Sequence, residues 1–121
     1  DSDEGGIEVP GVLVVLFAES LWYANAAHFV TDLEHELEHR PEPPRALVLD
    51  LVGMHDIDFT GARVLAELLD DLQRREIVVA IARAGATVRA NVERAGLMAR
   101  IGADHFFASV DAAVTAVAPS A

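Results

Sequence analysis

The chain has 121 residues, a formal net charge of −11 and no cysteine, and hydrophobic residues make up 52% of it. This length and apolar content predict one domain with a packed core and exclude a disordered chain. The lack of cysteine excludes disulfides, thiolate metal ligands and a cysteine nucleophile. The acidic balance argues against nucleic acid or an anionic lipid surface as the main partner.

Charge is distributed unevenly along the chain. Residues 1–82 carry 17 acidic and five basic side chains, whereas residues 83–121 carry three acidic and four basic ones. All of these basic residues are arginine, and a lysine-free, alanine-rich composition is typical of a GC-rich bacterial genome. No apolar run approaches the about 18 residues that cross a bilayer, so we expect no membrane-spanning segment within the chain.

The first part of the chain predicts a strand pair followed by a helix. Residues 7–9, with apolar Ile7 and Val9, and the apolar run 12–17 flank the turn-forming pair Pro10-Gly11, which is typical of a hairpin. From residue 25 to residue 39 apolar side chains recur at helical spacing. Asn25 is well placed to cap the start of this helix.

The middle of the chain predicts two buried strands around a helix. Residues 46–51 form a continuous apolar run broken by one aspartate, as in a strand that is covered on both faces. Residues 60–75 carry an apolar stripe opposite a charged face, which predicts an amphipathic helix. Residues 77–82 predict another buried strand.

The last part predicts a short helix at residues 86–95 ended by Gly96, a short edge strand at 105–107, and a final helix at 110–117 capped by Ser109. Together these elements predict an α/β fold in which helices pack against a mixed sheet. We expect a single domain over residues 7–118, preceded by a linker remnant at residues 1–6.

The stretch "HDIDFTG" at residues 55–61 lies between the strand and the amphipathic helix, where phosphate chemistry is common in α/β proteins. Its hydroxyl, on Thr60, is either a helix cap or a phosphorylation site, and the cap is the favoured interpretation. Asp56 and Asp58 suit the positive end of the helix dipole without any catalytic role. As a magnesium site they lack a further carboxylate nearby, except that of Asp50.

Histidines gather on the first predicted helix. His28, Asp32, His35 and His39 are spaced so that they lie along one helix face. Two imidazoles one turn apart can bind zinc, but this helix also carries several glutamates, so a solvated face is favoured and we expect no metal site. His105 is interpreted as a packed or capping side chain.

The segment "ARAGATVRANVERAG", residues 82–96, has the features of a weak phosphate site. It joins a predicted strand to a helix start through a glycine, and the free backbone N–H groups of a helix start favour anions. It has no Walker-type glycine–lysine spacing. The predicted phosphate-binding residues are Arg83, Gly85, Ala86, Thr87 and Arg89.

An aromatic pair, Trp22 and Tyr23, lies in the loop before the first helix. Three roles are open for it: packing in the core, stacking against the base of a nucleotide, or contact with a membrane part. We include both residues in the candidate nucleotide site.

Three segments of the chain resemble STAS domains of SulP-type anion transporters. They are "LFAESLWYANAAHFVTDL" at residues 16–33, "ALVLDLVGMHDIDFTGARVLAELLDDL" at 46–72 and "AGLMARIGADHFFASVDAAV" at 95–114. They occur in the family's order and with matching gaps, so the resemblance covers nearly the whole chain. One departure is Ser20, where the family usually has proline.

The resemblance implies a cytoplasmic regulatory module on the inner side of the plasma membrane, joined to the transmembrane part of a sulfate or related anion transporter. It also implies weak binding of a nucleotide (GDP, GTP or ATP) and contact with a cytosolic regulatory protein. No other cofactor is expected. The residues show no nucleophile–base pair or catalytic acid pair, so we expect no enzymatic activity.

STAS domains also resemble stand-alone anti-sigma factor antagonists, which act by partner switching and are phosphorylated on the first hydroxyl of an Asp-Ser-Ser-Gly motif. In this chain Phe59 occupies that position, and a phenyl ring accepts no phosphoryl group. We therefore expect no phosphorylation there, with Thr60 as the fallback. The antagonist is the alternative function, and a phosphatase or nucleotidase is a more distant one.

Overall fold

The computed structural model describes residues 9–17, 19–20 and 25–119. Among them, four strands form one sheet in the order β1-β2-β3-β4, and every neighbouring pair is parallel. The strands are β1 (Val12–Leu16), β2 (Ala46–Asp50), β3 (Val78–Ala82) and β4 (Phe106–Phe107). The first three end in register, so the loops that follow them leave the same edge of the sheet.

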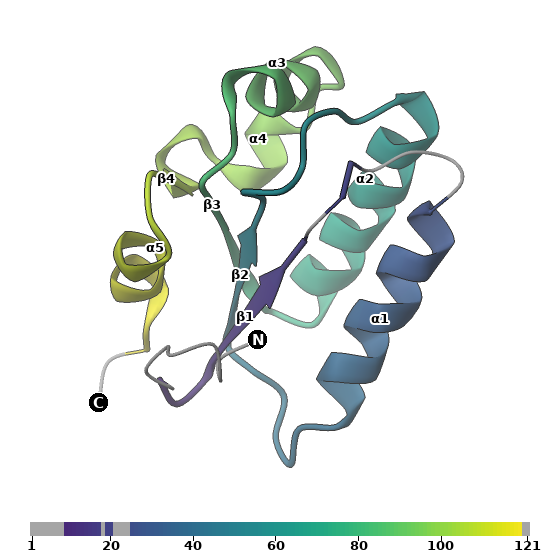
Figure 1. Ribbon diagram of the computed structural model, residues 1–121. Coiled ribbons are helices and arrows are strands. Elements are labelled where there is room, and N and C mark those ends of the chain that lie inside the picture. The colour runs from purple at the N-terminus through teal and green to yellow at the C-terminus, as the bar shows by residue number, and fades with distance from the viewer. Residues whose placement is uncertain (1–8, 18, 21–24, 120–121) are drawn as a thin grey trace.

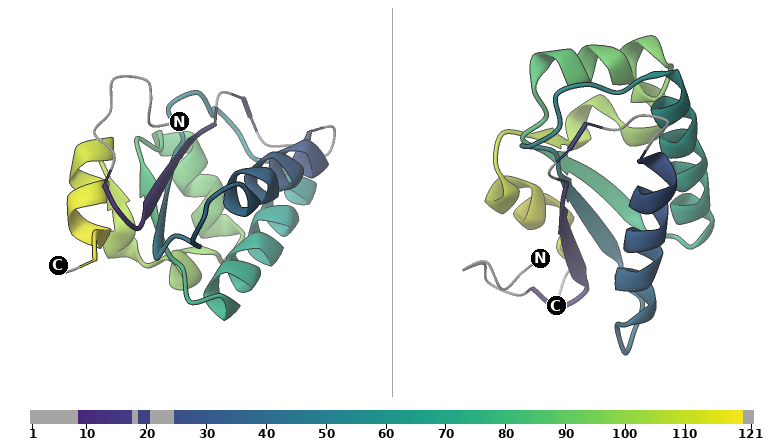
Figure 2. Two further views of the ribbon diagram at one scale, coloured as in Figure 1. Left: turned by 90° about the horizontal axis from the view of Figure 1, so that it is seen from below. Right: turned by 45° about the vertical axis from the view of Figure 1, so that its right-hand side comes forward.

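Five helices surround this sheet in the described part of the chain: α1 (Ala26–Glu38), α2 (Phe59–Arg74), α3 (Ala86–Arg94), α4 (Met98–Ile101) and α5 (Val110–Val117). Helices α1 and α2 lie together on one face, and α5 lies on the other (Figures 1 and 2). Helix α3 lies beyond the carboxyl ends of the strands (Figure 1), whereas α4 lies lower, beside α2 and the outer edge of β3.

The core has two parts because β2 alternates its side chains between the two faces of the sheet. Leu47 and Leu49 pack into the large cluster under α1 and α2. Ala46 and Val48 pack into a smaller cluster that includes Ala113 of α5. Since residues on the second face are small, α5 approaches the sheet closely with few large side chains of its own.

The predicted strands at 46–51 and 77–82 and the predicted helices are confirmed to within about two residues. Helix α4 was not predicted, because four residues are too few to show a helical period. Of the expected hairpin, Val9 is described: its carbonyl accepts from Val12 N–H at 3.1 Å across a turn with Gly11 at φ 83°. The strand that would make the sheet mixed, at residues 7–9, lies mostly outside the described residues.

Strand β4 is short and leaves part of its neighbour without a strand partner. It pairs only with Ile81 and Ala82 of β3. Directly before β4, the ring of His105 donates from Nδ1 to the carbonyl oxygen of Val79 at 3.0 Å. His105 is therefore a packed, hydrogen-bonded side chain, as the sequence predicts. In the described part of the chain, no helix is both long and apolar enough to cross a membrane.

Candidate functional site

The carboxyl edge of the sheet gathers the polar residues of the candidate site. The connections from β1 to α1, from β2 to α2 and from β3 to α3 all leave at this edge (Figure 1). In parallel α/β sheets this is the edge at which ligands bind.

Asp58, and not Thr60, caps α2. The helix begins at Phe59, and the Asp58 carboxylate accepts from the backbone N–H of Gly61 at 2.7 Å. A cap reaches the third residue of its helix, and Ser109 reaches Ala112 in the same way in α5. Thr60 is the second residue of the helix, so the prediction that its hydroxyl caps the helix is wrong. A carboxylate also interacts more favourably than a hydroxyl with the helix dipole.

The first residue of α2 points its ring into solvent. Phe59 is 80% exposed, more than any other large hydrophobic side chain in the described part of the chain. This follows from the position of the cap: the inward-facing residues of the helix are Gly61, Leu65, Leu68, Leu69 and Leu72. No pattern in the sequence predicted this exposure.

Asn91 joins the β2–α2 loop to α3. It is 8% exposed, its Nδ2 donates to Oδ1 of Asp56 at 2.7 Å, and its Oδ1 accepts from Arg94 at 3.1 Å. A buried amide with both ends bonded holds the two segments in one arrangement. Asn91 was not predicted from the sequence as a site residue. Its position beside Val88 and Val92 on the buried stripe of α3 is a signal that could have identified it.

Arg83 and Asp50 join the ends of β3 and β2. The Asp50 side chain is buried, and its carboxylate accepts two bonds from the Arg83 guanidinium and one from the backbone N–H of Val52. The bond to Asp50 raises the pKa of Arg83 above its ordinary value. Asp50, considered above as a magnesium ligand, is thus paired with a cation, and Arg83 is directed to Asp50 rather than to an open phosphate site.

The predicted phosphate segment forms a strand–glycine–helix junction. Gly85 stands at the N-cap of α3, whose first turn has no side-chain cap, and Ala86 and Thr87 are exposed. Arg89 lies 4.6 Å above the ring centre of Phe106, a cation–π contact. Nucleotide binding therefore stays a prediction. Trp22 and Tyr23 lie outside the described residues.

A cavity of about 500 Å³ opens between the start of α2 and α3. We call it the α2–α3 groove. Asp58 and Asn91 contribute to its wall, and two arginines, Arg63 and Arg94, line it as well. Its apolar lining residues are Ile57, Phe59, Ala62, Ala66, Ala95 and Leu97.

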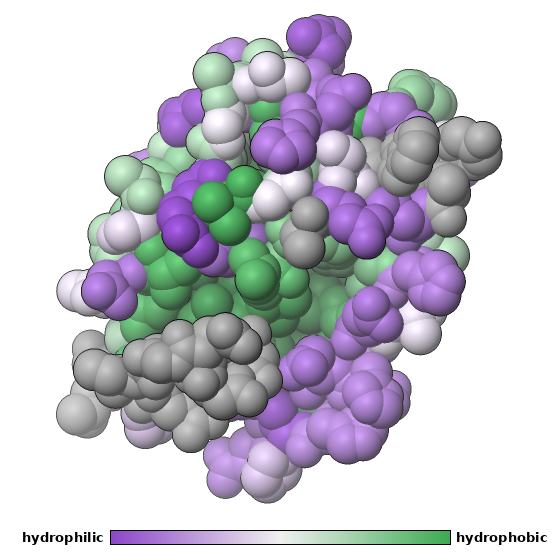
Figure 3. All heavy atoms as spheres, in the orientation of Figure 1, coloured by the Kyte–Doolittle hydropathy of each residue, from purple (hydrophilic) through white to green (hydrophobic). Residues whose placement is uncertain are grey.

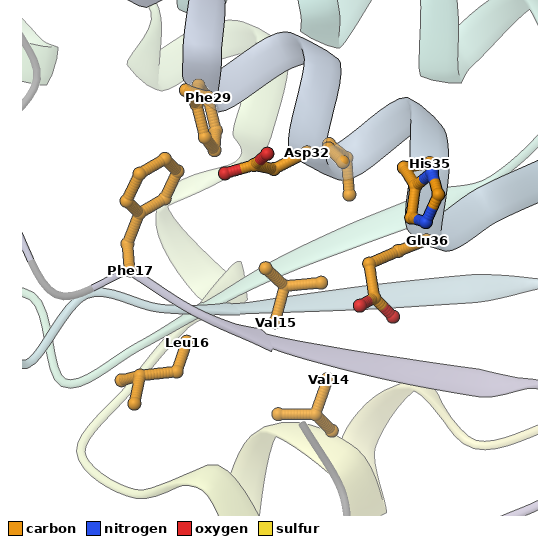
Figure 4. Close-up of a pocket in the computed structure, with 9 residues that line it drawn as sticks. Val14, Val15, Leu16, Phe17, Phe29, Asp32, His35 and Glu36 are labelled. Atoms are coloured by element: carbon orange, nitrogen blue, oxygen red, sulfur yellow. The ribbon is translucent and has the colours of Figure 1, made fainter. Parts of the chain in front are cut away.

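A second hollow, of about 290 Å³, lies between β1 and α1. Hydrophobic residues gather near β1 on the face that Figure 3 shows, beside the hydrophilic surface of α1. In Figure 4 the rings of Phe17 and Phe29 lie side by side, tilted by 54° with their centres 3.8 Å apart, and Val15 points into the hollow from β1. Asp32 and Glu36 supply carboxylates on the α1 side.

The histidine face of α1 is solvated. His28, His35 and His39 are exposed, and the His39 ring donates from Nδ1 to the carbonyl of His35 at 2.9 Å. Among the residues that the structure describes, no group of three His, Cys, Asp or Glu side chains is placed to hold a metal ion. Asn25 stands at the N-cap position of α1 but its amide donates to the carbonyl of Ser20 at 2.6 Å, so the predicted side-chain cap is absent.

The sequence of the chain is similar to those of known proteins. The family model described as "STAS domain" matches residues 7–113. The chain is 32% identical over 108 residues to a Mycobacterium tuberculosis protein named "Probable sulfate transporter", covering 89% of this chain and 19% of that protein. The chain thus spans about a fifth of the length of this relative.

Solved structures share the fold. The STAS domain of a SulP transporter from Vibrio cholerae has a TM-score of 0.74 at 24% identity, covering 95% of this chain and 88% of that one. A candidate anti-sigma factor antagonist from Thermotoga maritima has a TM-score of 0.76 at 16% identity, covering 92% and 91%. The family match spans most of the chain, and both structures support the fold. The chain therefore belongs to the STAS domain family.

Proposed function

We propose that the chain is the regulatory STAS domain of a bacterial SulP-type anion transporter and lies on the cytoplasmic side of the plasma membrane. The observation that carries this proposal is the 32% identity to a named sulfate transporter, of which the chain spans only 19%. A segment of this size leaves room for a transmembrane part elsewhere in the same polypeptide.

The arrangement of side chains at the carboxyl edge of the sheet favours a binding role over a catalytic one. Three carboxylates there already serve the fold: Asp50 pairs with Arg83, Asp56 accepts from Asn91, and Asp58 caps α2. General acid–base or nucleophilic catalysis needs a group that is positioned toward a substrate. The described residues of this edge instead present an open groove with an apolar surface.

Phe59 favours the transporter module over the anti-sigma factor antagonist. It replaces the hydroxyl that receives the phosphoryl group in the antagonists to which the sequence has a resemblance. Its neighbour Thr60 lies within the first turn of α2, with its side chain only partly exposed. A partner switch driven by phosphorylation at this position therefore lacks its acceptor.

Weak binding of a purine nucleotide at the start of α3 is a second candidate function. It is supported by the uncapped first turn of α3, where backbone N–H groups favour phosphate. Arg89 adds a cation one turn further along the helix, although it also stacks on Phe106. Since the chain carries a net charge of −11, the affinity for a polyanion should be low.

Uptake measurements on the whole gene product test the transporter assignment. The full reading frame that contains this sequence is expressed in bacteria lacking their own sulfate uptake systems, with and without the segment 7–118. We expect membrane localisation and saturable uptake of labelled sulfate or another anion, and a reduced or unregulated rate without the segment. A reading frame that encodes only a small protein without transmembrane helices would contradict the assignment and favour the antagonist.

A further inference from the structure

The exposed ring of Phe59 is an unusual feature for the surface of a small domain. It is 80% exposed at the mouth of the α2–α3 groove, whereas the other large exposed hydrophobics that the structure describes are each less than 50% exposed. Exposed aromatic side chains beside a concave apolar surface are typical of protein interaction sites.

The shape of the groove suits a helix. It lies between two helices, and Ala62 and Ala66, one turn apart on α2, line it together with Ala95 at the end of α3. Small side chains allow the backbone of a partner to approach closely. A cavity of about 500 Å³ is large enough for the side chains that an amphipathic helix inserts at successive turns.

The charge of the groove differs from that of the protein. Arg63 and Arg94 line it, while Asp58 is the only carboxylate among the described residues that line it, and it accepts from the backbone N–H of Gly61. The chain as a whole has a net charge of −11. The charged side chains among the described lining residues, two arginines and one carboxylate, therefore sum to +1, opposite in sign to the whole chain. A partner with carboxylates complements the two arginines.

The groove is held in its open shape by bonds within the protein. Asn91 accepts from Arg94 and donates to Asp56, so α3 is fixed to the loop that precedes α2. The guanidinium of Arg94 has five donors, so it can bind a carboxylate while it keeps Asn91. A preformed groove loses little conformational entropy when it is filled.

We infer that the α2–α3 groove binds an acidic amphipathic helix of a partner protein, whose apolar face covers Phe59 and whose carboxylates meet Arg63 and Arg94. This inference goes beyond the proposed function, because it concerns a site on the isolated domain whether or not a transporter carries it.

The test uses a defined probe. A fluorescently labelled peptide of about 16 residues, with leucine at helical spacing and glutamate at most other positions, is titrated with the purified domain. A peptide of the same composition with its leucines dispersed around the helix, and one with lysine for glutamate, are the controls. We expect saturable binding of the first peptide only, weakening as salt increases. Amide shifts in NMR spectra should centre on Ile57, Ala62, Ala95 and Leu97.

Matched variants locate the site. Phe59→Ala and Arg63→Glu should each weaken binding by about tenfold or more, as for central interface residues. Arg45→Glu and Val78→Ala alter an exposed arginine and an exposed hydrophobic residue at the opposite edge of the sheet, and they should leave binding unchanged. Circular dichroism spectra should match across all four variants, because each change is on the surface.

Three results would overturn the inference. One is the absence of saturable binding at millimolar peptide, or binding that Phe59→Ala and Arg63→Glu leave intact. Another is concentration-dependent dimerisation lost in Phe59→Ala, which would assign the groove to a second copy of the chain. The third is Phe59-dependent sedimentation with lipid vesicles, which would assign it to a membrane surface. None of these results depends on the uptake test of the proposed function.

Discussion

Arg83 binds Asp50 through two of its nitrogens, and this pair ties the ends of two neighbouring parallel strands at the edge where the α/β loops meet. The carboxylate is buried while the guanidinium is partly exposed. Removal of the arginine would leave a buried charge without its partner, which is the unfavourable way to break such a pair.

We therefore expect Arg83→Ala to lower the denaturant midpoint of unfolding clearly, and Arg83→Lys to recover only part of the loss, because lysine cannot form the two-point bond. Arg74→Ala, which removes a solvated arginine with a weak 3.7 Å contact to Asp71, is the control and should change little. An equal effect of Arg83→Ala and Arg74→Ala would contradict this account.

The contribution of Arg83 should not vary with pH in the ordinary working range. Its pKa is raised in the folded state, chiefly by the hydrogen bond to Asp50. A raised pKa of a cation gives stability that is complete below the unfolded pKa and lost only as pH rises through the folded one. Both values lie far above neutrality, so the midpoint difference between wild type and Arg83→Lys should stay constant from about pH 6 to 9. A difference that shrinks within this range would show that another group titrates with the pair.

The position of the α2 cap predicts which of two nearby substitutions lowers the free energy of unfolding more. Asp58→Ala should reduce the free energy of unfolding by about 1 kcal/mol, because it removes the acceptor for the N–H of Gly61. Thr60→Ala should cause little loss, because Thr60 lies inside the helix and alanine has the higher helix propensity. Chemical denaturation of both variants measures the order, and a larger loss for Thr60→Ala would restore the hydroxyl to a structural role.

Two helices end in the same motif with different residues at its left-handed position. After α2, Glu76 has φ 61°, Glu76 N–H donates to Gln73 and Ile77 N–H donates to Leu72. After α3, Gly96 has φ 78° with the equivalent bonds to Glu93 and Val92. These are Schellman motifs, in which glycine is the favoured residue.

Glu76→Gly should thus stabilise the domain by up to about 1 kcal/mol, and Gly96→Ala should destabilise it by a similar amount. Thermal unfolding of the two variants, with Glu76→Ala as the control that keeps a side chain, provides the measurement. A destabilised Glu76→Gly would mean that the glutamate side chain contributes more than the backbone strain removes.

Phosphorylation distinguishes the two proposed classes of STAS domain. Incubation with an anti-sigma kinase and ATP should give no mass increase, because Phe59 holds the position of the acceptor hydroxyl. An antagonist that carries serine at this position is the positive control. A stoichiometric phosphopeptide containing Thr60 would contradict the expectation and support partner switching.

The nucleotide prediction is tested by NMR titration with GDP, GTP and ATP. Binding at the start of α3 should give saturable shifts at Gly85, Ala86 and Thr87 that Arg89→Ala reduces. Arg100→Ala, on α4 and paired with Asp70, is the matched control. No shifts at millimolar nucleotide would end this candidate function.

Local patterns predicted the elements, while contacts between distant residues decided the site. The apolar runs and helical periods gave strands and helices close to those of the structure, because burial on one or two faces fixes the spacing of apolar residues. The cap of α2 was misplaced by two residues, since Asp58 and Thr60 are both competent caps. Asn91 and Asp56 are 35 residues apart, and no local sequence pattern predicts a hydrogen bond over this separation.

The exposure of Phe59 was equally invisible in the sequence, where the ring was interpreted only as a residue that cannot be phosphorylated. Its direction follows from the exact start of α2, and a shift of one residue turns a helix by about 100°. The groove beside Phe59 forms only where α3 packs next to α2, and the sequence does not show this contact. Fold and elements are therefore readable from the chain alone, whereas the surface that a partner meets depends on the three-dimensional assembly.

The short strand β4 has a consequence for the solubility of the domain. Beyond its two residues, the outer edge of β3 carries backbone groups that could pair with a strand of another molecule, as in the growth of fibrils. The ring of His105 occupies the carbonyl of Val79 on that edge, and the charged side chains of Arg100 and Glu76 flank it. The His105 imidazole thus occupies a backbone group at which a strand of another molecule could add to the sheet. In longer sheets a full neighbouring strand has this protective role.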